Sequence, residues 1–192
     1  MFKLVVLLSG EGTNLQAIMD KICEGEINAE LTAVISNRAV ANGLKRAENA
    51  GIPKVVLEHA HFSDREAFDQ SLAQIVDSYE PDLIVLAGFM RILSDGFVEK
   101  FQGKLINIHP SLLPKYKGLH THKRALENGD TEHGASVHYV VPALDSGEII
   151  AQAVVPVLDE DTEESLAQRV HEIEHIIYPQ AIQQIIAGEV GR

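Results

Sequence analysis

The feature that most constrains the fold is a regular alternation of short apolar runs with segments of helical periodicity. In Asn14–Ile22, for example, apolar residues recur at Leu15, Ile18 and Met19, which is the spacing of one helix face. The apolar runs have the length of buried strands: Leu4–Leu8, Leu31–Ser36, Val55–Leu57, Leu83–Ala87 and Lys104–Ile108. The segments between them predict helices over Asn14–Ile22, Asn42–Ala50 and Asp64–Tyr79, the last with Ser63 as N-cap and Glu66 completing a capping box.

Strands that alternate with helices through short connections are typical of a parallel sheet covered on both faces. Since the crossovers between parallel strands are nearly always right-handed, we predict an α/β fold with a Rossmann-like, doubly wound, mostly parallel sheet. The pattern changes after Ile108, where His109 to Gly118 contains two prolines and is expected to be an ordered loop. The remaining elements are predicted at Thr121–Asn128 (helix), Ser136–Val141 and Glu148–Leu158 (strands) and Thr162–Ala187 (helix).

No linker or internal repeat divides the 192 residues, so we expect a single domain, residues 1–192. A change in sequence pattern divides it into two halves, about 1–100 and about 101–192. No apolar run reaches the roughly 18 residues of a membrane span. The N-terminus lacks the features of a signal peptide, and Cys23 is the only cysteine, so we expect a cytoplasmic protein without disulfides or a cysteine metal cluster.

The charge is negative overall but uneven. Sixteen basic and 28 acidic residues give −12, which argues against general nucleic-acid binding. The stretch from Arg91 to Arg124 carries seven basic and two acidic residues. Two interpretations stay open here: a solvated surface with scattered charge, or a locally positive mouth for small anionic ligands.

Three segments carry residue types suited to chemistry. The first strand runs into Ser9-Gly-Glu-Gly-Thr-Asn14, where glycines and free N–H groups at a helix start suit one phosphate group. The segment lacks GxGxxG and a Walker lysine, so a dinucleotide or triphosphate is poorly supported. The alternative is a tight turn in which Ser9 or Asn14 only caps the helix.

The second segment places Asn107 and His109 two residues apart at the carboxyl end of a strand, so both side chains point to one face. An amide donor can stabilise an oxyanion while an imidazole moves a proton, which suits acyl transfer. The third segment, ending in Asp145-Ser-Gly147, is typical of an Asx-turn. Asp145 becomes a candidate only if the fold brings it to His109, where it would favour the imidazolium.

The histidines also invite a metal interpretation, at His120 with His122 and at His171 with His175. HExxH is absent and no cysteine partner exists, so the pattern does not favour a zinc site. A serine nucleophile is not favoured either, because Gly-x-Ser-x-Gly is absent.

Five segments together resemble one enzyme family along essentially the whole chain. They are Ser9–Asn14, Leu86-Ala-Gly-Phe-Met-Arg-Ile-Leu93, Asn107-Ile-His-Pro-Ser-Leu-Leu-Pro114, His120-Thr-His122 and Leu144-Asp-Ser-Gly147. In order and spacing they are similar to the phosphoribosylglycinamide formyltransferases, which use 10-formyltetrahydrofolate. Two positions depart from that pattern: Thr13 stands where serine is usual, and Lys117 where proline is usual, so that loop is expected to be looser.

The resemblance implies roles for particular residues. It implies a catalytic role for Asn107, His109 and Asp145. It implies binding of the glycinamide ribonucleotide (GAR) by Gly12, Thr13, Asn14, His171 and Glu174. It implies binding of the folate by Arg65, Met90, Arg91, Ile92, Leu93, Asn107, Val141, Pro142, Ala143, Leu144 and Asp145.

The implied reaction is formyl transfer from 10-formyltetrahydrofolate, as cosubstrate, to the amine of GAR in purine biosynthesis. It proceeds directly through a tetrahedral intermediate without a metal. The implied partners are these small molecules, with neither nucleic acid nor membrane, in a monomer or homodimer. The alternatives are a 10-formyltetrahydrofolate hydrolase, a methionyl-tRNA formyltransferase, or a nucleotide-binding module without catalysis. Intact Asn107, His109 and Asp145 speak against the last.

Overall fold

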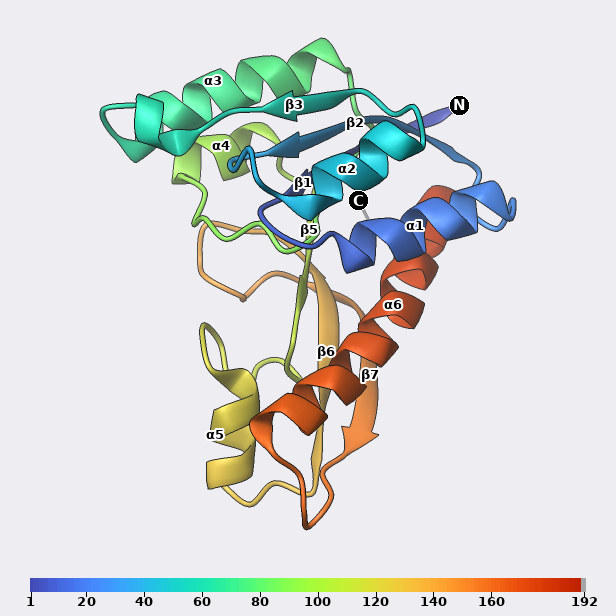
Figure 1. Ribbon diagram of the computed structural model, residues 1–192, viewed down its shortest axis with the longest axis vertical. Coiled ribbons are helices and arrows are strands. Elements are labelled where there is room, and N and C mark those ends of the chain that lie inside the picture. Colours follow the sequence, from blue (N-terminus) through green and yellow to red (C-terminus); the bar gives the residue numbers. More distant parts are fainter. Residues whose placement is uncertain (191–192) are drawn as a thin grey trace.

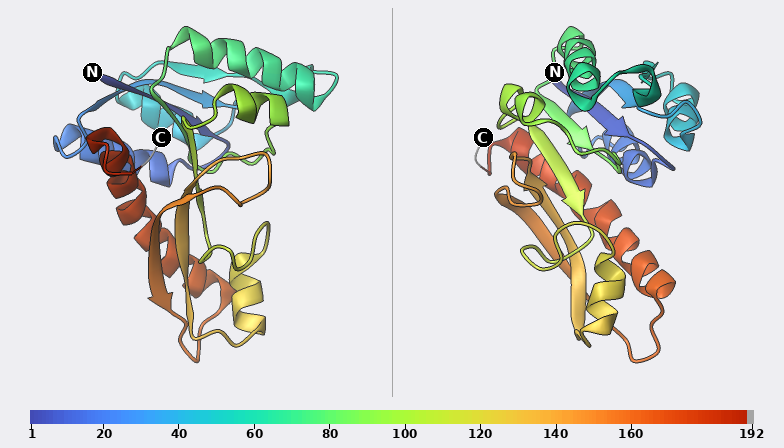
Figure 2. Two further views of the ribbon diagram at one scale, coloured as in Figure 1. Left: turned by 180° about the vertical axis from the view of Figure 1, so that it is seen from behind. Right: turned by 90° about the vertical axis from the view of Figure 1, so that its left-hand side faces the viewer.

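The computed structural model describes residues 1–190, which form a seven-stranded sheet with helices on both faces (Figures 1 and 2). The elements of the first half are β1 (Phe2–Leu8), α1 (Thr13–Cys23), β2 (Ala29–Ser36), α2 (Asn42–Asn49), β3 (Lys54–Val56), the 3-10 helix η1 (His59–His61), α3 (Arg65–Ser78) and β4 (Leu83–Leu86). Those of the second half are α4 (Asp95–Lys100), β5 (Leu105–His109), α5 (Thr121–Glu127), β6 (Glu132–Tyr139), β7 (Ile149–Pro156) and α6 (Glu163–Ala187).

The strand order is β3-β2-β1-β4-β5-β6-β7. Neighbours from β3 to β5 pair in parallel, whereas β5–β6 and β6–β7 are antiparallel. The predicted α/β fold with a mostly parallel, doubly wound sheet is therefore confirmed. The sheet reverses its direction of growth between β1 and β4, which is where folds of this kind place their ligand crevice.

Side chains of β1 alternate between two buried cores. Leu4, Val6 and Leu8 pack with residues of α1, α2 and α6, whereas Val5 and Leu7 pack with α3 and α4. This division follows from the two-residue repeat of a strand, and it explains why β1 is apolar on both faces. Helix α6 lies along β6 and β7 and reaches α1, so it joins the two halves of the chain (Figures 1 and 2).

Most predicted elements are present, with corrections at their ends. The N-cap of α3 is Asp64, whose carboxylate accepts from the N–H of Ala67 at 2.8 Å, and the predicted capping box of Ser63 and Glu66 is wrong. An ionised acceptor makes the stronger cap, and the Ser63 hydroxyl instead donates to Asp64.

Two elements of the second half differ further from the prediction. Helix α4 was not predicted, because it is only six residues long; it is capped by Ser94. Strand β6 begins at Glu132, four residues before the predicted start, because its whole length pairs with β7. Strand β7 ends at Pro156 rather than at Leu158.

Candidate active site

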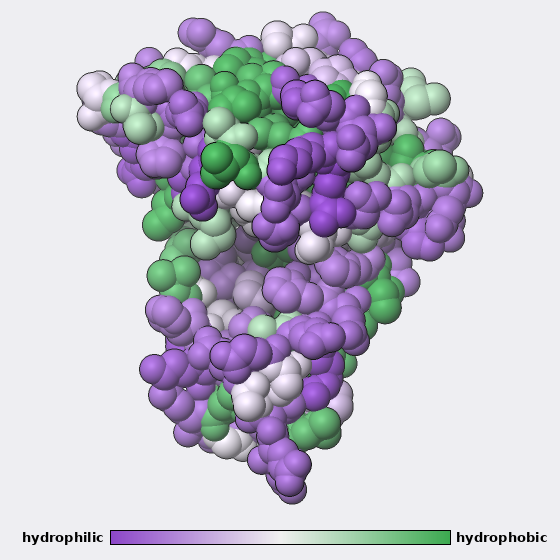
Figure 3. Space-filling model, in the orientation of Figure 1, coloured by the Kyte–Doolittle hydropathy of each residue, from purple (hydrophilic) through white to green (hydrophobic). Residues whose placement is uncertain are grey.

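The loops that follow β1 and β4 are held together at the crevice. The N–H of Ser9 donates to the carbonyl of Gly88 at 3.0 Å, and the Ser9 hydroxyl accepts from the N–H of Met90 at 2.8 Å. The predicted phosphate turn and the predicted folate segment are therefore neighbours. The face seen in Figure 3 is hollowed between the upper part of the molecule and the lower part around α5.

Gly12 shapes the turn at the start of α1. It is the N-cap residue with φ of 71°, and a Cβ there would lie 2.7 Å from the Cα of Gly43 in α2. A side chain at position 12 is therefore excluded both by the backbone conformation and by the close packing of the two helices. No side chain caps the first N–H groups of α1 within the described structure, which leaves them suited to an anion.

A buried carboxylate from α6 meets this turn. Oε2 of Glu174 accepts from Nδ2 of Asn14 at 3.1 Å and lies 3.0 Å from Nδ1 of His171. Glu174 is only 3% exposed, and one turn later Tyr178 fastens α6 to the sheet through a hydrogen bond to the carbonyl of Leu86. The fold thus brings together Asn14, His171 and Glu174, although Asn14 and Glu174 are 160 positions apart in the sequence.

The structure also joins the three residues of the second predicted cluster. Asn107 and His109 lie at the end of β5, and the loop after β6 brings Asp145 back to them. Oδ2 of Asp145 lies 3.5 Å from Nδ1 of His109 and accepts from the N–H of Gly118 at 2.9 Å. Asp145 adopts φ of 46°, an uncommon conformation for a residue with a side chain. Only glycine fits at position 147 of this loop, because a Cβ there would clash with the Tyr139 carbonyl oxygen.

His138 is a fourth member of this cluster that the sequence analysis missed. It pairs with Asn107 across the antiparallel β5–β6 ladder, and its Nε2 lies 3.4 Å from Nδ2 of Asn107 and 3.8 Å from Oδ1 of Asp145. Its Nδ1 lies 2.9 Å from the Tyr139 carbonyl, which only accepts, so Nδ1 carries the hydrogen and Nε2 accepts from Asn107. The only signal for His138 in the sequence is the register of two strands 31 residues apart.

Burial controls the charge of the neighbouring histidines. It lowers the pKa of His138, although the Tyr139 carbonyl and Asp145 act in the opposite direction. Burial also lowers the pKa of His133 to about 4. Nε2 of His133 lies 3.2 Å from Nδ1 of His122, so His122 has His133 as its neighbour. These rings are neutral near pH 7. At the phosphate turn the direction reverses, because the hydrogen bond to Glu174 raises the pKa of His171.

The residues predicted to bind folate come from three separate parts of the chain. Met90–Leu93 forms the loop after β4, and its Arg91 lies over the Phe68 ring of α3 at 4.9 Å. Nε of Arg91 is buried and has no partner within residues 1–190, so it is a donor without an acceptor. Met90, Ile92 and Leu144 are exposed apolar side chains. Arg65 starts α3 and pairs with its neighbour Glu66 rather than with the cluster.

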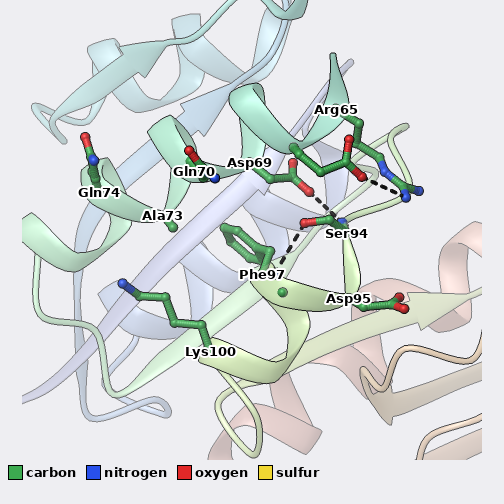
Figure 4. Close-up of a pocket in the computed structure, with 11 residues that line it drawn as sticks. Arg65, Asp69, Gln70, Ala73, Gln74, Ser94, Asp95, Phe97 and Lys100 are labelled. Carbon is green, nitrogen blue, oxygen red and sulfur yellow. Dashed lines mark hydrogen bonds and ion pairs between the residues drawn. The ribbon is translucent and has the colours of Figure 1, made fainter.

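A pocket of about 550 Å³ lies outside this crevice, between α3 and α4 (Figure 4). Arg65 is one of its lining residues, and Asp69 and Ser94 meet at its floor, whereas Asn107, His109 and Asp145 do not line it. Its three carboxylates, Glu66, Asp69 and Asp95, outnumber its two cations, Arg65 and Lys100, which does not favour an anionic ligand. The chemistry therefore points to the crevice and not to this pocket.

Residues 1–190 show neither a metal-binding cluster nor a membrane-spanning helix. No group of three or more His, Cys, Asp or Glu side chains is placed to hold a metal ion. Within the same residues, every helix is too short or too polar to cross a membrane.

Comparisons with known proteins agree with this arrangement. The profile of the formyl transferase family matches residues 2–182. A phosphoribosylglycinamide formyltransferase from Escherichia coli (strain K12) is 53% identical over 97% of this chain and 88% of the relative. The trifunctional purine biosynthetic protein adenosine-3 of Homo sapiens is 46% identical over 98% of this chain, which spans 19% of that larger protein.

Solved structures are similar over nearly the whole chain. The phosphoribosylglycinamide formyltransferase of Coxiella burnetii superposes with a TM-score of 0.93 at 54% identity and covers 97% of this chain and 88% of its own. Glycinamide ribonucleotide transformylase 1 of Symbiobacterium toebii has a TM-score of 0.97 at 44% identity and covers 100% and 91%. The resemblance expected from the sequence is confirmed.

Proposed function

This chain belongs to the formyl transferase family, and we propose that it transfers the formyl group of 10-formyltetrahydrofolate to the amine of GAR in purine biosynthesis. The observation that carries the proposal is the meeting of Asn107, His109 and Asp145 at the carboxyl end of β5, on the same edge of the sheet as the turn at Gly12–Asn14 that follows β1. A phosphate anchor next to an amide donor and an imidazole is what acyl transfer between two bound small molecules requires. None of the relatives described above is named as a hydrolase.

Each group has a role in this reaction. The amine of GAR attacks the formyl carbon, and Nδ2 of Asn107 donates to the oxygen that becomes negative in the tetrahedral intermediate. One N–H of that amide meets Nε2 of His138, which leaves the other for the oxyanion. His109 moves the proton between the attacking and the leaving nitrogen, and Asp145 stabilises the imidazolium.

The two ligands have separate binding regions in this proposal. Gly12, Thr13, Asn14, His171 and Glu174 bind GAR, with the phosphate at the start of α1. Arg65, Met90–Leu93 and Val141–Asp145 bind the folate, whose carboxylates suit the unpartnered Nε of Arg91. Residues 1–100 then form the nucleotide half and 101–192 the catalytic and folate half, with two exceptions. His171 and Glu174 reach the GAR region from the second half, and Arg65 and Met90–Leu93 contribute to the folate region from the first. We further propose that the protein acts in the cytoplasm on these small molecules, without metal, nucleic acid or membrane.

The test is a reaction with and without the acceptor. Purified protein is mixed with 10-formyltetrahydrofolate, and tetrahydrofolate and formyl-GAR are measured by mass spectrometry. Equal amounts of both products, formed only with GAR, are expected. Consumption of the folate with water alone would identify a hydrolase, and no consumption would identify a binding module. Either result would refute the proposal.

A further inference from the structure

Both ring nitrogens of His109 have a defined neighbour. Nε2 lies 2.8 Å from the carbonyl oxygen of Tyr116, and Nδ1 lies 3.5 Å from Oδ2 of Asp145. A backbone carbonyl only accepts, so Nε2 must carry a hydrogen for this short contact to be favourable. Loss of that hydrogen would set a lone pair against the Tyr116 carbonyl at 2.8 Å, whereas loss of the hydrogen from Nδ1 sets a lone pair against Asp145 only at the longer distance of 3.5 Å.

Nδ1 also faces the rest of the cluster. Asp145, which meets Nδ1 through Oδ2, meets Nε2 of His138 through Oδ1, and His138 in turn contacts Asn107. Nε2 points the other way, into the loop that contains Tyr116. The side of the ring that can exchange a proton with bound substrate is therefore the Nδ1 side.

The side chain of Tyr116 holds this carbonyl in place. Its hydroxyl donates to Oδ2 of Asp130 at 2.6 Å and accepts from Nδ2 of Asn128 at 2.8 Å. Nζ of Lys115 and Cζ of Arg124 lie 5.9 and 5.0 Å from the centroid of its ring. The hydrogen bond to Tyr116 lowers the pKa of Asp130, and the same bond raises the pKa of Tyr116, so acceptor and donor keep their forms around neutrality.

Tyr116 needs such an anchor because its backbone is in an unfavourable region. Its φ is 55°, which costs free energy in a residue with a β-carbon and persists only where contacts enforce it. Arg124 pins the following residues as well, since its Nη1 donates to the carbonyls of Lys117 and Leu119. The residues that hold Tyr116 therefore lie on α5 and directly after it, whereas the ring that Tyr116 orients, His109, lies at the end of β5.

We propose that Tyr116 is a positioning residue that fixes Nδ1 of His109 as the proton-transferring nitrogen. Its side chain, bound to Asp130, holds its carbonyl on Nε2. The inference rests on the acid–base role of His109 proposed above. As the acid, His109 breaks its Nδ1–H bond and keeps the electron pair, and the proton goes to the leaving folate nitrogen. The ring is then neutral with hydrogen on Nε2, and the proton released by the GAR amine restores Nδ1–H.

The test reads the tautomer directly. In protein labelled with ¹⁵N-histidine, long-range ¹⁵N–¹H spectra of the neutral His109 ring should show hydrogen on Nε2 alone. Tyr116→Phe removes only the anchoring hydroxyl and should give a mixture of both tautomers. It should lower kcat about tenfold and change the KM of either substrate less than twofold, because a mispositioned acid–base loses part of its effect. Asp130→Asn should shift both readouts in the same direction.

Tyr79→Phe is the matched control, since it removes the same atom at the end of α3 and should change neither readout. Thermal unfolding verifies that each variant is folded. If Tyr116→Phe does not fold, Asp130→Asn is used in its place. A wild-type ring with hydrogen on Nδ1, or an unchanged tautomer in folded variants, would overturn the proposal. The spectra need no substrate, so this outcome is distinct from a failure of the proposed transferase activity.

Discussion

The turn at Gly12–Asn14 and the cluster at the end of β5 are built in opposite ways. The turn offers backbone N–H groups, and its shape depends on Gly12, because the absence of a side chain there lets the start of α1 lie close to Gly43 of α2. The cluster offers side chains from β5, β6 and the loop that holds Asp145. The comparison indicates that the proposed phosphate site rests on main-chain geometry inside the parallel part of the sheet, whereas the proposed proton transfer uses side chains gathered where the sheet becomes antiparallel.

The two regions also differ in how they treat charge. At the cluster, burial lowers the pKa of His138 and keeps the ring neutral, so it orients Asn107 without competing for a proton. At the turn, the carboxylate of Glu174 raises the pKa of the more exposed His171. The buried ring beside Asn107 is thus kept neutral, whereas His171 is drawn toward its charged form near N–H groups that suit a phosphate.

The largest effect on this difference between the two regions is expected from His109→Ala. Removing a general acid–base should lower kcat by about 10²–10⁴-fold. The KM for GAR should stay within about twofold, because the phosphate is bound elsewhere. Steady-state kinetics test this, with His61→Ala on exposed η1 as the control. If kcat fell by less than tenfold, the acid–base role assigned to His109 would be wrong.

Asn107→Ala should have the next largest effect. Loss of one oxyanion donor costs on the order of 3 kcal/mol in the transition state, or roughly 10²-fold in kcat. Substrate affinities should change little. If the variant instead kept its kcat and only bound substrate more weakly, Asn107 would belong to the binding region.

Glu174→Gln tests the binding region alone. The amide that replaces the carboxylate can still accept from Asn14 but carries no charge. A charge-assisted hydrogen bond to GAR is worth about 1 kcal/mol more than a neutral one. The KM for GAR should therefore rise roughly fivefold at constant kcat and constant KM for folate. Glu172→Gln, an exposed neighbour on α6, is the control. A change in kcat would show that the two regions are not separable.

The smallest effect concerns pH. Because Glu174 raises the pKa of His171 above its ordinary 6.5, the charged pair stabilises the fold fully below pH 6.5. This stabilisation is lost as pH rises through the raised folded value. His171 is 57% exposed, so solvent screening limits the effect to less than about 1 kcal/mol, or roughly 3 °C. Melting curves of the wild type and His171→Gln should differ at pH 6 and converge at alkaline pH.

Much of the fold follows from local patterns. The two-residue alternation of Leu4–Leu8 between two cores and the spacing of apolar residues in α1 both reflect contacts within one element. The spacing of Asn107 and His109 is of the same kind, because neighbours two apart in a strand share a face. These features could be predicted because short-range geometry alone determines them.

What the sequence by itself determined is therefore the order of elements and the position of each candidate group along the chain. Only the tertiary structure decided which groups meet: His138 with Asn107 through the β5–β6 register, Glu174 with Asn14, and Tyr116 with both Asp130 and His109. The Asn14–Glu174 contact spans 160 residues. Such contacts depend on strand register, on the packing of α6 against α1 and on backbone conformations such as that of Tyr116. All three arise from the balance of interactions over the whole chain, and no local pattern encodes that balance.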